Sequence, residues 1–267
     1  SHNSSLISKY AKVWWRVAVA SLLSQLSTPL ASVGYLLGKL VRLFFFCVFI
    51  VAIFGHTQSL KGYSLIETVL FFLTFNLIDM IAQLFFRGIY GARRIVMDGD
   101  LDYFLIQPVN PLFRMTTGTV DFLDLFTLLP VLGMTGYTLF HLPEYLSLAH
   151  LGLYAFLLFN GILIALAIHI AVAAIAVRTQ ELENTIWIYR DLMAFGRFPV
   201  DIYSPGVRWV LTLVIPIAVM TSFPTQAFLG RLSVEKMLFS SGLTIAMIGI
   251  SLWLWRQSLK RYMSVSS

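Results

Sequence analysis

Long apolar runs separated by short polar or charged segments dominate this chain. The runs occupy about residues 33–55, 66–86, 116–140, 148–177 and 237–256. Each reaches the roughly 18–20 residues that a helix needs to cross about 30 Å of hydrocarbon. Backbone groups in lipid must be hydrogen-bonded internally, and the short alternating segments of a membrane β-barrel are not seen. The pattern therefore predicts an all-α polytopic membrane protein.

The region between the fourth and the last of these runs allows two interpretations. Hydropathy alone places a span at 208–229, but Pro216 and Pro224 interrupt it. Alternatively, a short span at about 182–197 is followed by a re-entrant segment at 198–230, which enters the outer leaflet and returns. Irregular backbone at membrane depth is tolerated where protein covers it or where it lines a cavity. Either interpretation predicts six transmembrane helices, with both termini on the same side.

The N-terminal segment has a different pattern. Lys9, Lys12 and Arg16 alternate there with apolar and aromatic residues, including a pair of tryptophans. A basic amphipathic stretch of this kind is typical of a helix that lies in the headgroup plane. The pattern therefore divides the chain into an N-terminal tail with an interfacial helix (1–30) and a six-span transmembrane domain (31–267).

Composition and charge agree with this topology. Hydrophobic residues make up 58% of the 267 residues and charged residues 12%, against about 25% charged in soluble domains. On the predicted topology, 14 of the 19 Lys and Arg residues fall on one face, whereas Lys61 is alone in the first two opposite loops. The positive-inside rule therefore predicts cytoplasmic termini, and the net charge of +6 does not indicate a nucleic-acid partner. Lys39 and Arg42, inside the first apolar run, are expected to snorkel toward the cytoplasm.

One sizeable charged segment, the cytoplasmic loop at 87–115, follows the second apolar run. A basic helix is expected to end at Asp98 and Gly99, and a short apolar helix to begin with Asp100 or Asp102 as its cap. Two prolines then end this second helix. The carboxylates lack the glycine and the glutamate that a Ca²⁺ loop places later in its sequence. The segment is either a solvated loop or a short helix that docks into a partner protein.

Carboxylates inside membrane spans are functional candidates because their desolvation is costly. Asp121 and Asp124 are three residues apart and share one helix face. We expect them to lie at the interface or to pair with Arg93, Arg94 or Arg114.

Asp79 and His169 are expected to lie deeper, as a proton relay or as groups that form hydrogen bonds between helices. No catalytic residue and no metal site is predicted. The histidines lack the spacing of metal ligands, and no Gly-x-Ser-x-Gly sequence occurs. The nearest approach to a P-loop has Leu40 where Ser or Thr must hold Mg²⁺.

Two motifs resemble those of bacterial ABC-2 type permeases. The first runs from Gly99-Asp-Leu-Asp102 through Leu105-Ile-Gln-Pro108-Val-Asn-Pro111, and the second is Gly196-Arg-Phe-Pro-Val-Asp-Ile-Tyr203. With the six-span layout, the resemblance covers essentially the whole chain. It implies the membrane subunit of an ATP-driven exporter in the bacterial inner membrane, with no catalytic site and no cofactor of its own. ATP and Mg²⁺ would be bound by separate cytoplasmic ATPase subunits, and the second permease would be an identical copy or a related chain.

The resemblance also implies three functional regions. The helix that couples the permease to the ATPase maps to Arg93, Arg94, Asp98, Gly99, Asp100, Leu101, Asp102, Tyr103, Phe104 and Leu105. The re-entrant segment includes Phe198, Pro199, Pro216 and Pro224. A substrate cavity is expected at Phe45, Phe72, Phe75, Asn76 and Asp79. Its aromatic walls suit an amphipathic, lipid-like or drug-like substrate; the alternative is that these phenylalanines face lipid.

The fifth span is unusually charged, and Glu183 and Arg190 are expected to pair on one face. Two other classes of function stay open. A proton-coupled secondary transporter would use intramembrane carboxylates and would be expected to show inverted repeats, which are not evident. A membrane-embedded enzyme acting on lipids would use His169 or His141.

Overall fold

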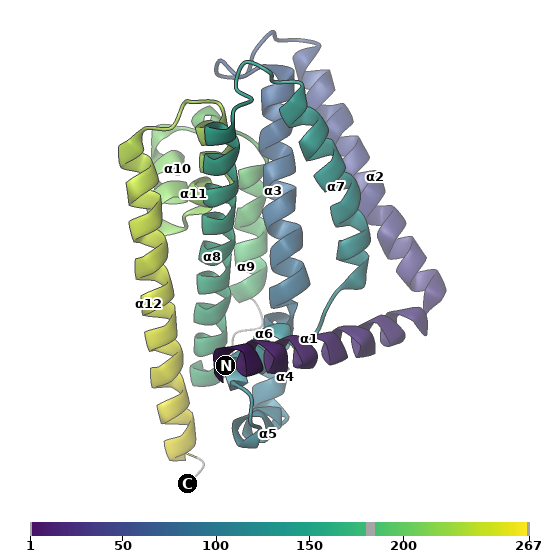
Figure 1. The fold of residues 1–267 in the computed structure, drawn as a ribbon, viewed down its shortest axis with the longest axis vertical. Helices are drawn as coiled ribbons and strands as arrows, with labels where there is room; N and C mark the ends of the chain where they lie inside the picture. The colour runs from purple at the N-terminus through teal and green to yellow at the C-terminus, as the bar shows by residue number, and fades with distance from the viewer. Residues whose placement is uncertain (1, 180–184, 266–267) are drawn as a thin grey trace.

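The computed structural model describes residues 2–179 and 185–265. It is 84% helical, with no strand in the described residues, which confirms the predicted all-α class. In Figure 1 the long helices run side by side as a bundle, and α1 (His2–Leu26) lies across its lower end. Among these residues, five helices are long and apolar enough to cross a membrane. They are α2 (Pro29–Phe54), α3 (Leu65–Phe86, which continues through η1 and α4 to Met97), α7 (Phe122–Phe140), α8 (Leu148–Thr179) and α12 (Val234–Val265).

The third long helix begins later than the sequence pattern predicted. The expected span at 116–140 is divided, because α6 (Pro111–Thr117) ends at Gly118 and α7 starts at Phe122. Asp121 caps α7 by accepting a hydrogen bond from the backbone N–H of Leu123 at 3.0 Å. An aspartate at this position satisfies a backbone donor that the first helical turn leaves open. The polar cap therefore sets the start of the helix, and apolar composition alone does not.

The region of the expected fifth span contains short helices. α9 (Thr185–Met193) and the 3₁₀ turn η2 (Ala194–Arg197) are the described part of the predicted span at 182–197. The predicted pairing of Glu183 with Arg190 lies outside the described residues. Nine helical residues rise only about 14 Å, less than the thickness of the hydrocarbon.

The chain then turns sharply at Pro216. It passes η3 (Val200–Ile202), α10 (Pro205–Trp209) and the π-helical turn η4 (Val210–Val214), and it bends by 100° into α11 (Ile217–Phe228). Such a bend belongs either to a broken span or to a re-entrant loop, so the predicted re-entrant segment stays a prediction. Every residue of α11 is buried, and this coverage is the condition under which interrupted helices are stable at membrane depth.

Small residues allow α11 to approach its neighbours closely. A Cβ atom on Gly161 of α8 would lie 2.6 Å from the carbonyl oxygen of Met220, and one on Gly196 would lie 2.7 Å from the hydroxyl of Thr221. Close backbone contact at small residues is a common way for helices to pack inside membranes. α11 is therefore held against α8 on one side and against η2 on the other.

A polar network holds the α2–α3 loop against the C-terminal end of α11. The Tyr63 hydroxyl and the Gln226 amide each donate a hydrogen bond of 2.8 Å to Asp201, which lies in η3. Arg231 donates a hydrogen bond of 3.1 Å to Glu67 at the start of α3. Burial, together with the hydrogen bond to Asp201, raises the pKa of Tyr63 to about 12. Three stretches of the chain, around 63–67, 201 and 226–231, are thus joined at this end of the bundle.

At the opposite end, α1 has two different faces. Ala18 is fully buried and packs with Trp14 against Leu84 and Val120, whereas Trp15 is 62% exposed. A helix with one face on protein and an aromatic residue on the other is suited to the headgroup plane.

Candidate functional site

The charged loop at 87–115 folds into a helical hairpin. α4 (Ala92–Met97) ends at Asp98, and Gly99 then adopts φ = +79°, a left-handed conformation that favours glycine. α5 (Asp100–Ile106) starts directly after it. Asp100 and Asp102 lie in the first turn of α5, and no side chain caps this helix. The prediction that one of them is the cap was therefore wrong, although both carboxylates are favourably placed at the positive end of the helix dipole.

The residues expected to contact an ATPase differ in accessibility. Leu101 is fully buried, so it anchors α5 to the bundle and cannot dock into a partner in this conformation. Tyr103 is 60% exposed, and two residues outside the predicted set, Met97 and Ile106, are 58% and 80% exposed. Of the other predicted residues, Arg94, Asp98, Gly99, Asp100 and Asp102 are exposed, whereas Arg93, Phe104 and Leu105 are partly buried. Figure 1 shows α5 at the lower end of the structure, below α1.

A close backbone contact ties this hairpin to the membrane helices. A Cβ atom on Gly88, in the 3₁₀ turn η1 (Arg87–Gly91), would lie 2.2 Å from the carbonyl oxygen of Met115 and 2.7 Å from that of Thr116. Only glycine fits such an approach. The end of α3 and the helix α6 therefore contact each other directly, backbone against backbone.

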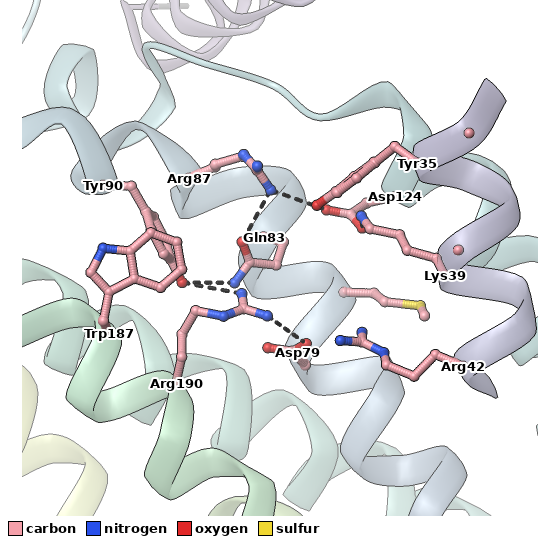
Figure 2. Close-up of a pocket in the computed structure, with 13 residues that line it drawn as sticks. Tyr35, Lys39, Arg42, Asp79, Gln83, Arg87, Tyr90, Asp124, Trp187 and Arg190 are labelled. Atoms are coloured by element: carbon pink, nitrogen blue, oxygen red, sulfur yellow. Dashed lines mark hydrogen bonds and ion pairs between the residues drawn. The ribbon is translucent and has the colours of Figure 1, made fainter. Parts of the chain in front are cut away.

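A cavity of about 460 Å³ lies between α2, α3, η1 and α9. This volume is within the range of small-molecule sites. Figure 2 shows Lys39 and Arg42 from α2, Asp79 and Gln83 from α3, and Trp187 and Arg190 from α9 directed toward it. The full lining is Gly34, Tyr35, Gly38, Lys39, Arg42, Asp79, Met80, Gln83, Arg87, Tyr90, Asp124, Trp187 and Arg190.

The five residues predicted for the substrate cavity separate into three groups. Asp79 lines the cavity itself. Phe72, Phe75 and Asn76 line a smaller cleft that shares Lys39, Arg42 and Met80 with the cavity. Phe45 lines neither space and is 63% exposed on α2.

The carboxylates of Asp121 and Asp124 pair with cations from the transmembrane helices. Lys39 donates a hydrogen bond to Asp124 and lies 3.6 Å from Asp121, and Arg87 lies 2.9 Å from Asp121. Of the two expectations for these carboxylates, the pairing with Arg93, Arg94 or Arg114 was wrong, because the first turn of α7 faces α2 and α3 rather than the α4–α5 hairpin. The expectation that Lys39 snorkels was also wrong, since a buried carboxylate partner holds its ammonium group inside the protein.

A second polar network connects α9 to α3. Arg190 lies 3.6 Å from Asp79 and donates a hydrogen bond of 3.2 Å to the Tyr90 hydroxyl, and Gln83 donates to the same hydroxyl at 2.8 Å. Trp187 packs edge-on to Tyr90, with ring centroids 5.4 Å apart. Asp79 on α3 is thus the ion-pair partner of Arg190 on α9.

His169 is fully buried on α8, among aromatic rings. Its Nδ1 lies 2.7 Å from the carbonyl oxygen of Ala165, and its Nε2 has no hydrogen-bond partner among the described residues. No direct hydrogen bond links it to Asp79 in the described part of the chain, so the structure does not connect these two residues as a relay.

Two arginines next to the cavity differ from the paired cations. Within 4.0 Å of Arg42 and Arg197, no carboxylate is found among the described residues. Arg197 instead lies over the rings of Phe46 and Phe75, with its guanidinium carbon 5.4 Å and 5.5 Å from their centroids. Neither arginine was predicted as a site residue. For Arg42 the sequence did offer a signal, namely a charge inside an apolar run. Such a charge can belong to a functional residue as well as to a side chain that snorkels to the membrane surface.

Comparison with known proteins assigns the family. Neither the curated proteins nor the solved structures gave a match. A model of the family described as ABC-2 family transporter protein matches residues 40–266, which is most of the chain. This match confirms the resemblance drawn from the two motifs. The chain therefore belongs to the ABC-2 transporter family and is a multi-pass membrane component of a transport system.

Proposed function

We propose that this chain is the permease subunit of an ABC exporter, driven by a separate cytoplasmic ATPase that docks on the α4–α5 hairpin. The observation that supports this most directly is the exposed apolar surface of the hairpin, formed by Met97, Tyr103 and Ile106. Exposed apolar residues grouped on a projecting helix are typical of a protein contact. The ATPase binds and hydrolyses ATP, and the permease has no catalytic site of its own.

The distribution of charge supports a cytoplasmic location for the hairpin. Of the 14 cations first assigned to one face, Lys39, Arg42, Arg87 and Arg190 line the cavity instead. The other ten gather at the end of the bundle that carries α1, the hairpin and the C-terminal part of α12. They are Lys9, Lys12, Arg16, Arg93, Arg94, Arg114, Arg178, Arg256, Lys260 and Arg261. The opposite end carries Lys61, Arg208, Arg231 and Lys236. This asymmetry favours cytoplasmic termini in a bacterial inner membrane.

The proposed mechanism is rigid-body coupling. Closure of the ATPase moves α5, and the buried Leu101 transfers this movement to the bundle. Through α4 and η1 the movement reaches α3, and through the contact at Gly88 it reaches α6 and then α7. Because packed helices move as units between discrete arrangements, a tilt of α3 and α7 against α2 would change the access to the cavity.

α2 supplies the proposed contact surface for a second permease. Only 11% of its apolar span is buried within this chain, and Phe44, Phe45 and Phe49 are each more than half exposed. We propose that a second copy, or a related permease, covers part of this face and that lipid covers the remainder.

The test is co-purification with a candidate ABC ATPase from the same organism. Ile106→Asp and Tyr103→Asp place a charge on the exposed surface of the hairpin and should abolish co-purification and stimulated ATP hydrolysis while membrane insertion is retained. Leu148→Asp is the matched control, because Leu148 is 89% exposed at the opposite end of the bundle. If both hairpin variants assemble with the ATPase and stimulate it as the wild type does, the coupling surface lies elsewhere.

A further inference from the structure

Arg42 occupies an unusual position for a charged residue. It lies 13 residues after Pro29 in the 26-residue helix α2, about 20 Å from either end at 1.5 Å per residue. A charge at this depth is costly, and residues of this kind in membrane proteins line substrate or ion pathways. In Figure 2 the Arg42 side chain extends from α2 into the space beside Asp79.

The cations around Arg42 have internal partners. Lys39 and Arg87 are paired with Asp121 and Asp124, and Arg190 is paired with Asp79. Five cations therefore line the cavity and its side cleft, and three carboxylates pair with them: Asp79 and Asp124 in the cavity lining, and Asp121 outside it. The excess of two positive charges falls on Arg42 and Arg197, the two arginines without a carboxylate partner among the described residues.

The geometry leaves these two arginines available to a ligand. Both line the side cleft, and Arg42 also lines the main cavity. The guanidinium of Arg197 lies over the rings of Phe46 and Phe75, and these cation–π contacts hold it in place. Stacking of this kind leaves the N–H groups of a guanidinium free, and their planar fork matches the oxygens of a phosphate, carboxylate or sulfonate.

The remaining wall of the main cavity is aromatic. Tyr35, Tyr90 and Trp187 line it from three different elements. A ligand that fills about 460 Å³ would thus meet rings along one wall and an unpaired cation at the junction with the side cleft. A lipophilic cation would add to the positive excess, and an uncharged ligand would leave the arginines unneutralised.

We infer that the substrates of this permease are amphipathic anions. Their anionic group binds Arg42 and Arg197, and their apolar body lies against Tyr35, Tyr90 and Trp187. This inference rests on the proposed function and makes it more specific, because aromatic walls alone suggested only a lipid-like or drug-like substrate.

Binding of naphthyl phosphate tests the inference. The ligand is titrated by calorimetry into the purified full chain in phosphatidylcholine nanodiscs, with naphthylmethylammonium as a cation of similar shape. We expect the phosphate to bind and the ammonium compound to bind at least tenfold more weakly. Arg42→Gln and Arg197→Gln should each weaken phosphate binding about tenfold or more, the usual effect of losing a charge-assisted hydrogen bond. Lys236→Gln, at an exposed cation near the start of α12, should leave binding unchanged.

Two further ligands define the class. Inorganic phosphate should bind far more weakly than naphthyl phosphate, because it makes no contact with the aromatic wall. Competition by phosphatidylglycerol added to the nanodiscs would identify an anionic lipid as the occupant and would support the inference. Where Arg42→Gln does not give monodisperse protein, Arg42→Lys replaces it. Lysine keeps the charge but lacks the planar fork, so a severalfold loss is expected.

Equal binding of the two naphthyl compounds would overturn the inference. The inference would also be overturned if inorganic phosphate bound as tightly as naphthyl phosphate. The same holds if both glutamine variants bound naphthyl phosphate with the affinity of the wild type. The measurement uses the permease without its ATPase. Its outcome is therefore independent of the hairpin test, and a failure of either test leaves the other interpretable.

Discussion

Replacing Gly88 by alanine tests the contact that links the α4–α5 hairpin to the membrane helices. The added Cβ would lie 2.2 Å from the carbonyl oxygen of Met115 and 2.7 Å from that of Thr116, where ordinary contact begins at 3.4 Å. Because these oxygens belong to the backbone of α6, the helix itself must move by about 1 Å. Overpacking of this kind typically costs about 1–3 kcal/mol.

Gly91→Ala is the matched control, since Gly91 lies in the same 3₁₀ turn and its Cβ would meet no atom within 4 Å. We expect this variant to remain within about 0.5 kcal/mol of the wild type. Both variants are unfolded by denaturant in detergent, followed by tryptophan fluorescence, and both are assembled with the ATPase to measure stimulated hydrolysis. Gly88→Ala should lower the free energy of unfolding by about 1–3 kcal/mol and reduce stimulation. If it matches Gly91→Ala in both assays, the contact between η1 and α6 neither stabilises the protein nor transmits movement.

Two predictions concern the polar networks beside the cavity and around Tyr63. Asp124→Asn removes one of the two carboxylate partners of Lys39, whose side chain is only 13% exposed, and leaves Asp121 at 3.6 Å. It should lower the free energy of unfolding by about 1.5–3 kcal/mol. The double variant with Lys39→Met should recover part of this loss, and a single variant as stable as the wild type would contradict the buried pairing. Tyr63→Phe removes the hydrogen bond to Asp201 and should cost about 1–3 kcal/mol near neutral pH. The pKa of Tyr63 is raised to about 12 from 10.0. The stabilisation that its neutral hydroxyl gives to the folded state is therefore fully present below pH 10 and is lost as the pH rises through about 12. The free energies of unfolding of the wild type and Tyr63→Phe should converge as the pH is raised between these values. A difference that stays constant would refute the assigned hydrogen bond from Tyr63 to Asp201.

The sequence by itself determined the membrane-spanning class and most of the helix positions. The extent of α3 and α8 follows from apolar runs long enough to cross a bilayer, a property that each segment has without its neighbours. The break at Gly99 was also predictable, because a left-handed glycine acts through its own backbone geometry. Pro111 was expected only to end the preceding helix, and the helix α6 that starts there was not predicted.

Only the tertiary structure decided which charges meet and which apolar residues are exposed. Asp121 was expected to lie at the interface or to pair with arginines of the 87–115 loop and its flank, but its partners are Lys39 on α2 and Arg87 in η1. Leu101 was assigned to the docking surface, but it is fully buried, whereas Ile106 is 80% exposed. The physical reason is that helices apolar on every face have no periodic pattern that fixes their rotation. The direction of each side chain is then set by the packing of neighbouring helices.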